Sequence, residues 1–310
     1  MQTSPHIFST FAAQMKNHKS GFVNIIGKPN AGKSTLLNAL LGEKLSIISH
    51  KPQTTRHRIL GIKTEPGYQI VFSDTPGVLK PGYGLHKAMM ETVEKSLEDA
   101  DVILWLIDAL ETSDGFDDLP LFTHHKQMPV IIAINKIDEV SDELVQRAIS
   151  DWRTKFNPTE IIAISALQKT NLNELQDLIL KYIPEGPPYF EDEQLTDKTE
   201  RFIVSEFIRE QIFHQYREEI PYSTEVNIIE FKDTEALIRI RAEIICERES
   251  QKIILIGKGG SAIKQLGIKA RKEIENFLNK KIYLELTVKV RDGWRNNEML
   301  LKSFGYKNHS

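Results

Sequence analysis

Residues 27–34, Gly27-Lys-Pro-Asn-Ala-Gly-Lys-Ser34, match the pattern G-x-x-x-x-G-K-[ST]. An apolar run of strand length at 22–26 precedes them, and a helical pattern at 35–41, ended by Gly42, follows. A strand, a glycine-bounded loop and a helix N-terminus together form a nest of backbone N–H groups that suits a polyphosphate. The residues expected to line this site are Gly27, Lys28, Pro29, Asn30, Ala31, Gly32, Lys33, Ser34 and Thr35.

The fixed positions of this pattern have distinct chemical tasks. Gly27 and Gly32 let the backbone approach phosphates without a Cβ clash. Lys33 is expected to reach the β- and γ-phosphates, and the Ser34 hydroxyl to ligate Mg²⁺. The pattern alone is compatible with ATPases, kinases and GTPases, so other residues must select the base.

Short apolar runs alternate with helical patterns between residues 22 and 183. Strands without polar alternation are buried on both faces, so we expect an α/β P-loop domain with a mostly parallel sheet and helices on both faces. Ligands of such sheets bind beyond the carboxyl ends of the strands. The runs lie at 22–26, 69–73, 102–107, 130–134 and 160–165, and the helical patterns at about 85–99, 118–126, 141–156 and 171–182, the last beginning like a capping box at Asn171 and Glu174.

The tetrapeptide Asp74-Thr-Pro-Gly77 directly follows the run 69–73. A carboxylate there can hold a water on Mg²⁺, and the Gly77 N–H can sense a γ-phosphate and release its loop on hydrolysis. The nucleotide contacts expected from this loop are Asp74, Thr75, Pro76, Gly77 and Val78.

Guanine selection is predicted from Asn135-Lys-Ile-Asp138, which follows the run 130–134. An Asp138 carboxylate can accept hydrogen bonds from N1–H and the N2 amino group of guanine, whereas adenine presents neither donor. The Lys136 stem can lie over the base while Asn135 ties this loop to the phosphate loop. The expected base contacts are Asn135, Lys136, Ile137 and Asp138, with Ser165, Ala166 and Leu167 offering a backbone N–H to guanine O6.

These four motifs, in this order, resemble the nucleotide-binding boxes of Ras-like GTPases. The resemblance implies hydrolysis of GTP to GDP and phosphate with Mg²⁺, and a switch loop at Thr54-Thr-Arg-His57 that closes over the γ-phosphate. Thr55 is taken as the switch ligand of Mg²⁺, and Thr54 remains the alternative. The implied metal ligands are Ser34, Thr55 and Asp74, and the implied catalytic residues are Asn30, Lys33, Thr55, Asp74 and Gly77.

One departure from the Ras-like pattern concerns the rate. Val78 stands where Ras has a glutamine that orients the attacking water, so slow intrinsic hydrolysis is expected. Asn30 is similar to an asparagine that ligates K⁺ in potassium-activated bacterial GTPases. K⁺ is therefore a candidate second cation.

The charge of the chain separates near its C-terminal end. Residues 191–250 hold 8 Lys/Arg against 16 Asp/Glu, whereas residues 251–310 hold 13 against 5. The basic segment contains Ile256-Gly-Lys-Gly-Gly260, which resembles the GxxG loop of KH domains, where glycines and a helix N-terminus approach an RNA backbone. The expected RNA contacts are Ile256, Gly257, Lys258, Gly259, Gly260, Lys264 and Lys269.

The element order of the second half is also typical of a KH domain. A helix is predicted at 198–215, strands at 225–231, 236–245 and 281–290, and a helix at 261–278; periodicity leaves 251–256 open between helix and strand. With a short helix at 251–256 the order becomes α-β-β-α-α-β, that of the bacterial type II KH domain. We therefore expect an α+β type II KH domain after the α/β domain.

A GTPase domain followed by one type II KH domain resembles the bacterial Era family. The resemblance implies binding of 16S rRNA near its 3′ end, assistance in 30S subunit assembly, a cytoplasmic monomer and peripheral contact with the membrane. The expected organisation is an N-terminal extension at 1–19, a GTPase domain at 20–184, a linker at 185–197 and a KH domain at 198–310.

Two rival functions are also compatible with the sequence. A GTPase accessory to tRNA modification usually needs a catalytic cysteine or a cofactor domain, and the one cysteine, Cys246, sits in a predicted strand without a supporting motif. An RNA-binding adaptor with a degenerate nucleotide site conflicts with the intact Lys33, Ser34, Asp74 and Asp138. Trp105 and Trp152 are expected to pack in the core, and Trp294 either to stack on a base or to anchor the C-terminal part.

Overall fold

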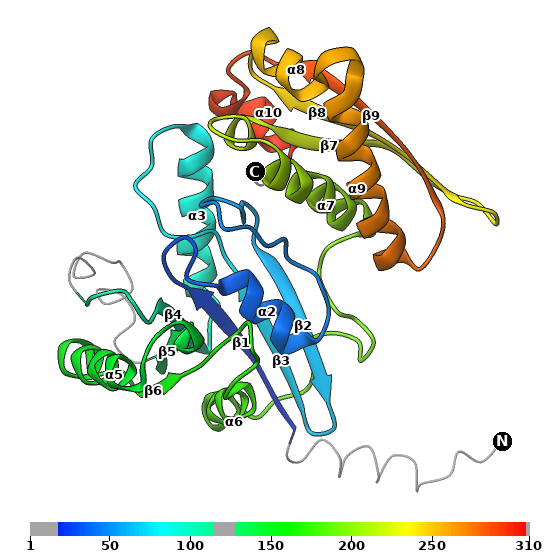
Figure 1. Cartoon of the computed structure of the whole chain (residues 1–310). Helices are drawn as coiled ribbons and strands as arrows, with labels where there is room; N and C mark the ends of the chain where they lie inside the picture. Colours follow the sequence, from blue (N-terminus) through cyan, green and yellow to red (C-terminus); the bar gives the residue numbers. More distant parts are fainter. Residues whose placement is uncertain (1–17, 114–127, 308–310) are drawn as a thin grey trace, which may run out of the picture. The chain divides into compact units, whose positions relative to one another are not determined.

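The computed structural model describes residues 18–113 and 128–307 (Figure 1). It divides into two compact units, each built from several stretches of chain. The first comprises Met1–Glu43, Arg58–Val78 and Thr92–Asp197, and the second comprises Lys44–His57, Leu79–Glu91 and Lys198–Ser310, within the described residues. The helix predicted at 118–126 and most of the extension at 1–19 lie outside the described residues.

The first unit is built on a six-stranded sheet in the order β2-β3-β1-β4-β5-β6. β2 pairs antiparallel with β3, and the other pairings are parallel. The predicted parallel sheet is confirmed. β2 was not predicted, because an edge strand that carries Lys63, Thr64 and Glu65 lacks the apolar run of a buried strand. The strands are β1 (Lys19–Ile26), β2 (Ile59–Glu65), β3 (Tyr68–Asp74), β4 (Val102–Asp108), β5 (Val130–Asn135) and β6 (Glu160–Ala163).

Helices cover both faces of this sheet, as predicted. On one face, α2 (Lys33–Leu41) and α6 (Leu172–Tyr182) share a buried apolar cluster with the strands. On the other, α5 (Asp142–Phe156) and the second half of α3 (Gly84–Glu98) do the same. There Trp105 and Trp152 are both buried, with ring centroids 5.2 Å apart in an edge-on arrangement, so both are packing residues as expected.

The capping box predicted at Asn171 is wrong. Asn171 has a φ of 57°, and its side chain makes no hydrogen bond to the start of α6. Its amide group instead donates to the Ala163 carbonyl at 2.9 Å. The side chain therefore ties the start of α6 to the end of β6 and does not cap the helix.

The segment predicted as a linker is bound to the first unit. The buried side chain of Gln69 donates to the Phe190 carbonyl at 2.9 Å and accepts from the backbone N–H groups of Tyr189 and Phe190. Further along, Ile62 N–H donates to the Leu195 carbonyl at 2.8 Å. These bonds restrict residues 185–197 to one path along the first unit.

The second unit contains a three-stranded sheet in the order β7-β8-β9, with β7 antiparallel and β9 parallel to β8. Residues 251–256 are helical, so the α-β-β-α-α-β order holds and the predicted KH fold is confirmed. The elements are α7 (Glu200–Gln215), β7 (Glu225–Asp233), β8 (Ile238–Cys246), α8 (Glu249–Ile256), α9 (Ser261–Leu278), β9 (Ile282–Val290) and the unpredicted short helix α10 (Glu298–Ser303).

Two stretches that lie inside the range 20–184 by sequence pack into the second unit. Ile47 joins the core cluster of the KH fold, and the first half of α3 packs with Trp294 and Leu301. Trp294 is fully buried and its indole N–H donates to the Ser223 carbonyl at 2.9 Å. It therefore anchors the C-terminal part and cannot stack on a base.

Candidate functional site

The phosphate loop joins β1 to α2 in the conformation that its glycines allow. Gly32 has a φ of 100°, and a Cβ there would lie 2.3 Å from the Asn135 amide nitrogen. Asn30 is exposed and left-handed, with a φ of 67°. Residues 27–32 thus adopt the compact turn that presents backbone N–H groups at the start of a helix.

Lys33 is folded back into this loop. Its ammonium donates to the carbonyls of Gly27 and Lys28 at 3.1 and 2.9 Å. Burial lowers the pKa of Lys33 to about 8, and the nearby charges of Asp74 and Glu111 oppose the shift. The loop therefore holds a cation that a polyphosphate would stabilise.

This lowered pKa predicts a pH dependence of nucleotide affinity. Bound phosphates stabilise the ammonium form of Lys33. When the pH is high enough for Lys33 to lose its proton in the free protein, nucleotide binding must take that proton up again. Affinity for GTP should be constant below pH 8 and fall by up to about tenfold per pH unit above it. Calorimetric titrations from pH 7 to 9 measure this slope. Lys33→Arg stays protonated and should give a flat profile; an equal slope in both proteins would contradict the assignment.

A Mg²⁺ ion fits beside this lysine. The Ser34 hydroxyl donates to Asp74 Oδ2 at 2.7 Å, and Asp74 is fully buried at the end of β3. Hydroxyl and carboxylate oxygens are the ligands Mg²⁺ prefers, with water and phosphate completing the octahedron. The Asp74–Val78 loop touches the phosphate loop, because Val78 N–H donates to the Gly27 carbonyl at 3.3 Å. Thr75 fixes its start by donating to the Ile25 carbonyl.

Asn135 joins three loops at the carboxyl edge of the sheet. Its amide nitrogen donates to the Ala31 carbonyl at 2.8 Å, and its amide oxygen accepts from Ala166 N–H at 2.9 Å. Asp138, in the short turn Ile137–Glu139, is exposed and therefore open to a base. Beside it, Ser165 is buried and Leu167 is 69% exposed.

Two acidic residues of this edge were missed in the sequence. Asp108, the last residue of β4, pairs with the Lys136 ammonium at 2.5 Å. Glu111 lies near Lys28 and Lys33, and burial raises its pKa. The position of Asp108 at a strand end was the available signal, but the pairing depends on the register that sets Asp108 opposite Asn135.

The candidate switch threonines belong to the second unit, whereas Ser34 and Asp74 lie together in the first. Thr54 donates its hydroxyl to the Lys51 carbonyl at 2.7 Å, and its own carbonyl accepts from Arg209. Thr55 is also buried. The hydroxyl of Thr54 thus has a local structural bond.

The GxxG loop lies between α8 and α9. Gly257 ends α8 with a φ of 73°, where a Cβ would lie 2.6 Å from that of Ala262. Gly260 caps the N-terminus of α9, and Lys258, Lys264 and Lys269 are exposed. Backbone N–H groups, glycine and free ammonium groups suit an RNA backbone. The apolar side chains of Ile253, Ile254 and Ile268, which belong to no sequence motif named above, are also exposed on these two helices.

The fold and the two sites define a P-loop GTPase that carries a KH RNA-binding domain. A family model described as 50S ribosome-binding GTPase matches residues 22–136, and a KH domain model matches residues 219–295. GTPase Era of Clostridium kluyveri is 46% identical over 93% of this chain and 99% of its own length, and that of Clostridium botulinum is 45% identical over 94% and 99%. The chain belongs to the Era family of GTPases.

Solved structures agree with this assignment. A crystal structure of Era in complex with MgGDPNP and nucleotides 1506–1542 of 16S ribosomal RNA has a TM-score of 0.89 and 44% identity, covering 93% of this chain and 99% of that one. A variant of Aquifex aeolicus Era bound to GDP and AlF₄⁻ has the same TM-score and coverage at 45% identity.

Proposed function

We propose that this chain is a GTP-hydrolysing switch that binds 16S rRNA near its 3′ end and assists assembly of the 30S subunit. The observation that carries the proposal is its match, over nearly its whole length, to an Era structure that holds MgGDPNP and a 16S rRNA segment. The 50S description belongs to a model that spans only residues 22–136, so it carries less weight for the RNA partner.

The nucleotide would be held by four loops. Gly27–Thr35 would surround the phosphates, Asp74–Val78 the γ-phosphate, and Asn135–Asp138 with Ser165–Leu167 the base. Ser34, Thr55 and Asp74 would hold Mg²⁺, which supplies charge neutralisation at the β- and γ-phosphates. Support comes from the Ser34–Asp74 contact, the buried Lys33 and the bonds of Asn135.

The RNA would be held by the GxxG loop. Ile256–Gly260 would approach the sugar-phosphate backbone closely, and Lys264 and Lys269 would contact phosphates. Crosslinking the protein in a bacterial lysate and sequencing the attached RNA tests the partner. Enrichment of the 3′ end of 16S rRNA is expected; enrichment of tRNA or 23S rRNA would refute the proposal.

Hydrolysis would be slow without help, because the partly buried Val78 cannot orient water. K⁺ near Asn30 would then supply positive charge. Hydrolysis should be about 10²-fold faster in KCl than in NaCl at equal ionic strength, the lower end of the effect of one lost transition-state contact. Asn30→Gly preserves the left-handed backbone and should remove the difference. Equal rates in Na⁺ and K⁺ for the unchanged protein would exclude the K⁺ site.

A role accessory to tRNA modification is disfavoured by Cys246. This thiol is fully buried in β8, and burial raises its pKa, so it is a poor nucleophile.

No helix within 18–113 and 128–307 has the length and apolarity needed to cross a membrane. We infer a cytoplasmic monomer, with any membrane contact peripheral.

A further inference from the structure

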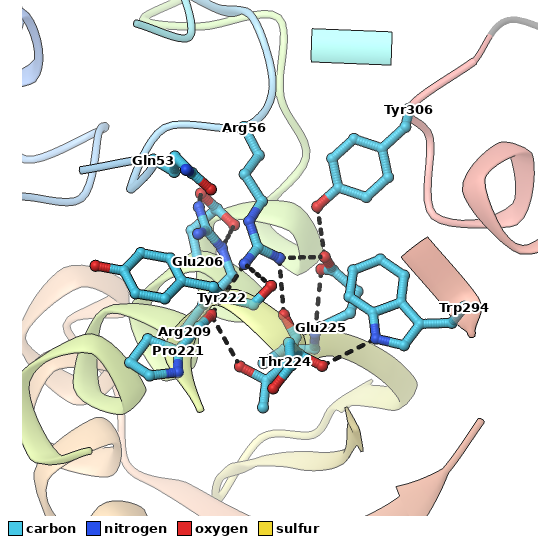
Figure 2. Close-up of polar contacts among 12 residues, drawn as sticks. Gln53, Arg56, Glu206, Arg209, Pro221, Tyr222, Thr224, Glu225, Trp294 and Tyr306 are labelled. Atoms are coloured by element: carbon cyan, nitrogen blue, oxygen red, sulfur yellow. Dashed lines mark hydrogen bonds and ion pairs between the residues drawn. The ribbon is translucent and has the colours of Figure 1, made fainter. Parts of the chain in front are cut away.

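The ion pair between Asp108 and Lys136 in the first unit is more open than the pair formed by Arg56 and Glu225 in the second. The side chains of Arg56 and Glu225 are 2% and 6% exposed, and the guanidinium also donates to neighbouring backbone carbonyls (Figure 2). Those of Asp108 and Lys136 are 20% and 29% exposed. The first pair is enclosed by the fold, whereas the second lies within reach of a ligand.

Three hydrogen bonds determine where the Asp108 carboxylate lies. Asp108 ends β4 in register with Asn135, and the next residue, Ala109, donates its N–H to the Asn135 carbonyl at 2.9 Å. Asp108 Oδ1 accepts from Leu110 N–H at 3.0 Å, and the Asp108 carbonyl accepts from Glu111 N–H at 2.8 Å. The side chain thus closes a turn on its own backbone. One carboxylate oxygen is held by this turn, so the other, Oδ2, also has a defined position.

The side chain of Lys136 is held at both of its ends. Its backbone is left-handed, with a φ of 66°, and directly follows Asn135, whose amide group bonds to Ala31 and Ala166. Its ammonium lies 2.5 Å from Asp108 Oδ2. A flexible four-carbon stem joins these two ends. The stem therefore runs between two fixed points at the carboxyl edge of the sheet, where ligands of such sheets bind.

The pairing also decides which part of Lys136 a nucleotide would meet. Lys33 lies within the phosphate loop, where its ammonium donates to backbone carbonyls, and is placed to meet phosphates. The ammonium of Lys136 is instead neutralised by a carboxylate. What remains for the ligand is the apolar stem, and such stems readily cover apolar surface while the charged head stays at its own partner. The flat face of a purine base is such a surface.

Ordering this stem before a nucleotide arrives makes binding less costly. A lysine side chain that becomes immobilised only on binding lowers affinity by a factor of about 2 to 10 through lost rotamer freedom. A side chain already immobilised by an intramolecular partner does not lose that freedom again on binding. Asp108 supplies such a partner without occupying the space in front of the stem.

We propose that Asp108 is a positioning residue of the guanine site, which holds the Lys136 stem in place for the base before the nucleotide binds. Asp108 acts through Lys136 and does not itself contact the nucleotide. This inference rests on the proposed role of Asn135–Asp138 in base binding. It assigns the contribution of Asp108 to the base and none of it to the phosphates.

Asp108→Asn in the full-length protein tests the positioning role. Asparagine retains an oxygen that accepts from Leu110 N–H but loses the charge that holds the ammonium. Competition against a fluorescent GDP at fixed Mg²⁺ compares GDP with inorganic pyrophosphate, which has no base. The affinity for GDP should fall by about 2- to 10-fold relative to that for pyrophosphate. A purely structural role would weaken both ligands alike; an unchanged ratio of the two affinities overturns the inference.

Glu160→Gln is the matched control. Glu160 is 28% exposed and pairs with Lys181 at 2.8 Å, so the substitution removes a carboxylate of similar exposure from an ion pair of the same unit. Glu160 is the first residue of β6 and thus lies at the end of its strand away from the carboxyl edge. The variant should keep the affinity ratio of the unchanged protein. An equal change of the ratio in both variants would show a general effect of charge and would refute the inference.

Lys136→Ala distinguishes failure of this inference from failure of the proposed base contact. Alanine removes the stem, so GDP affinity should fall relative to pyrophosphate at least as far as in Asp108→Asn. If Lys136→Ala has no effect, the proposed base contact fails and the inference with it. If Lys136→Ala weakens GDP binding and Asp108→Asn does not, only the positioning role fails.

The double variant shows whether Asp108 acts through Lys136. Two residues that act through one contact are not additive, so Asp108→Asn should cause no further loss of GDP affinity once Lys136 is alanine. A further loss of the size seen in the single variant would mean that Asp108 affects the nucleotide by another route. That result would overturn the inference even if both single variants behave as expected.

Discussion

Asp138→Asn is expected to weaken GTP binding by about 10²- to 10⁴-fold, the cost of two charge-assisted hydrogen bonds. The exposed carboxylate lies in the turn after β5, and the Asn135 bonds hold that turn beside the phosphate loop. The variant should in turn prefer XTP. Xanthine has an oxygen in place of the guanine N2 amino group, so an asparagine amide can donate to it.

Competition titrations of GTP and XTP against a fluorescent nucleotide measure this change. Glu139→Gln is the matched control, because it removes the same charge from the next residue of the same exposed turn. It should leave both affinities unchanged. If Asp138→Asn lost GTP and XTP binding together, local misfolding would explain the loss; unchanged GTP binding would show that Asp138 does not contact guanine.

Replacing Lys258 and Gly259 together by aspartate should weaken 16S rRNA binding by about 10²-fold, since like charges brought together cost several kcal/mol. Both residues are exposed between α8 and α9, and neither packs in the core. GTP hydrolysis without RNA should remain at the level of the unchanged protein. Binding to a 16S rRNA 3′-end fragment, followed over a range of salt concentrations, measures the effect.

The paired variant Asn279→Asp with Lys281→Asp applies the same change in charge at the other end of α9, where both residues are exposed. It should reduce RNA affinity far less. The slope of log K against log[salt] should fall by about one only when Lys258 is lost. Equal losses in the two double variants would show that RNA responds to overall charge and not to the GxxG loop.

The nucleotide motifs could be predicted because each is local. Eight consecutive residues specify the phosphate loop, and Asp74 and Asp138 each follow a strand that apolar composition identifies. A parallel sheet then places the carboxyl ends of its strands at one edge without further information. The same locality explains why the helix–strand order of the second unit was predicted correctly.

The contacts that depend on register or on distant segments could not be predicted. Asp108 meets Lys136 because two parallel strands align Asp108 with Asn135. The edge strand β2 and the fixed path of residues 185–197 depend on pairing with strands already in place. Propensity and periodicity describe neighbours in sequence, and these partners are not neighbours.

By itself, the sequence determined the class of GTPase and the order of the two folds. Only the tertiary structure decided that Lys44–His57 belongs to the second unit. By sequence it lies within the GTPase half, but Arg56 and Glu225 are 169 residues apart and bury their charges against each other. Charged residues of α7 are exposed or buried according to whether another segment packs over them. No local sequence pattern indicates packing by a segment so distant along the chain.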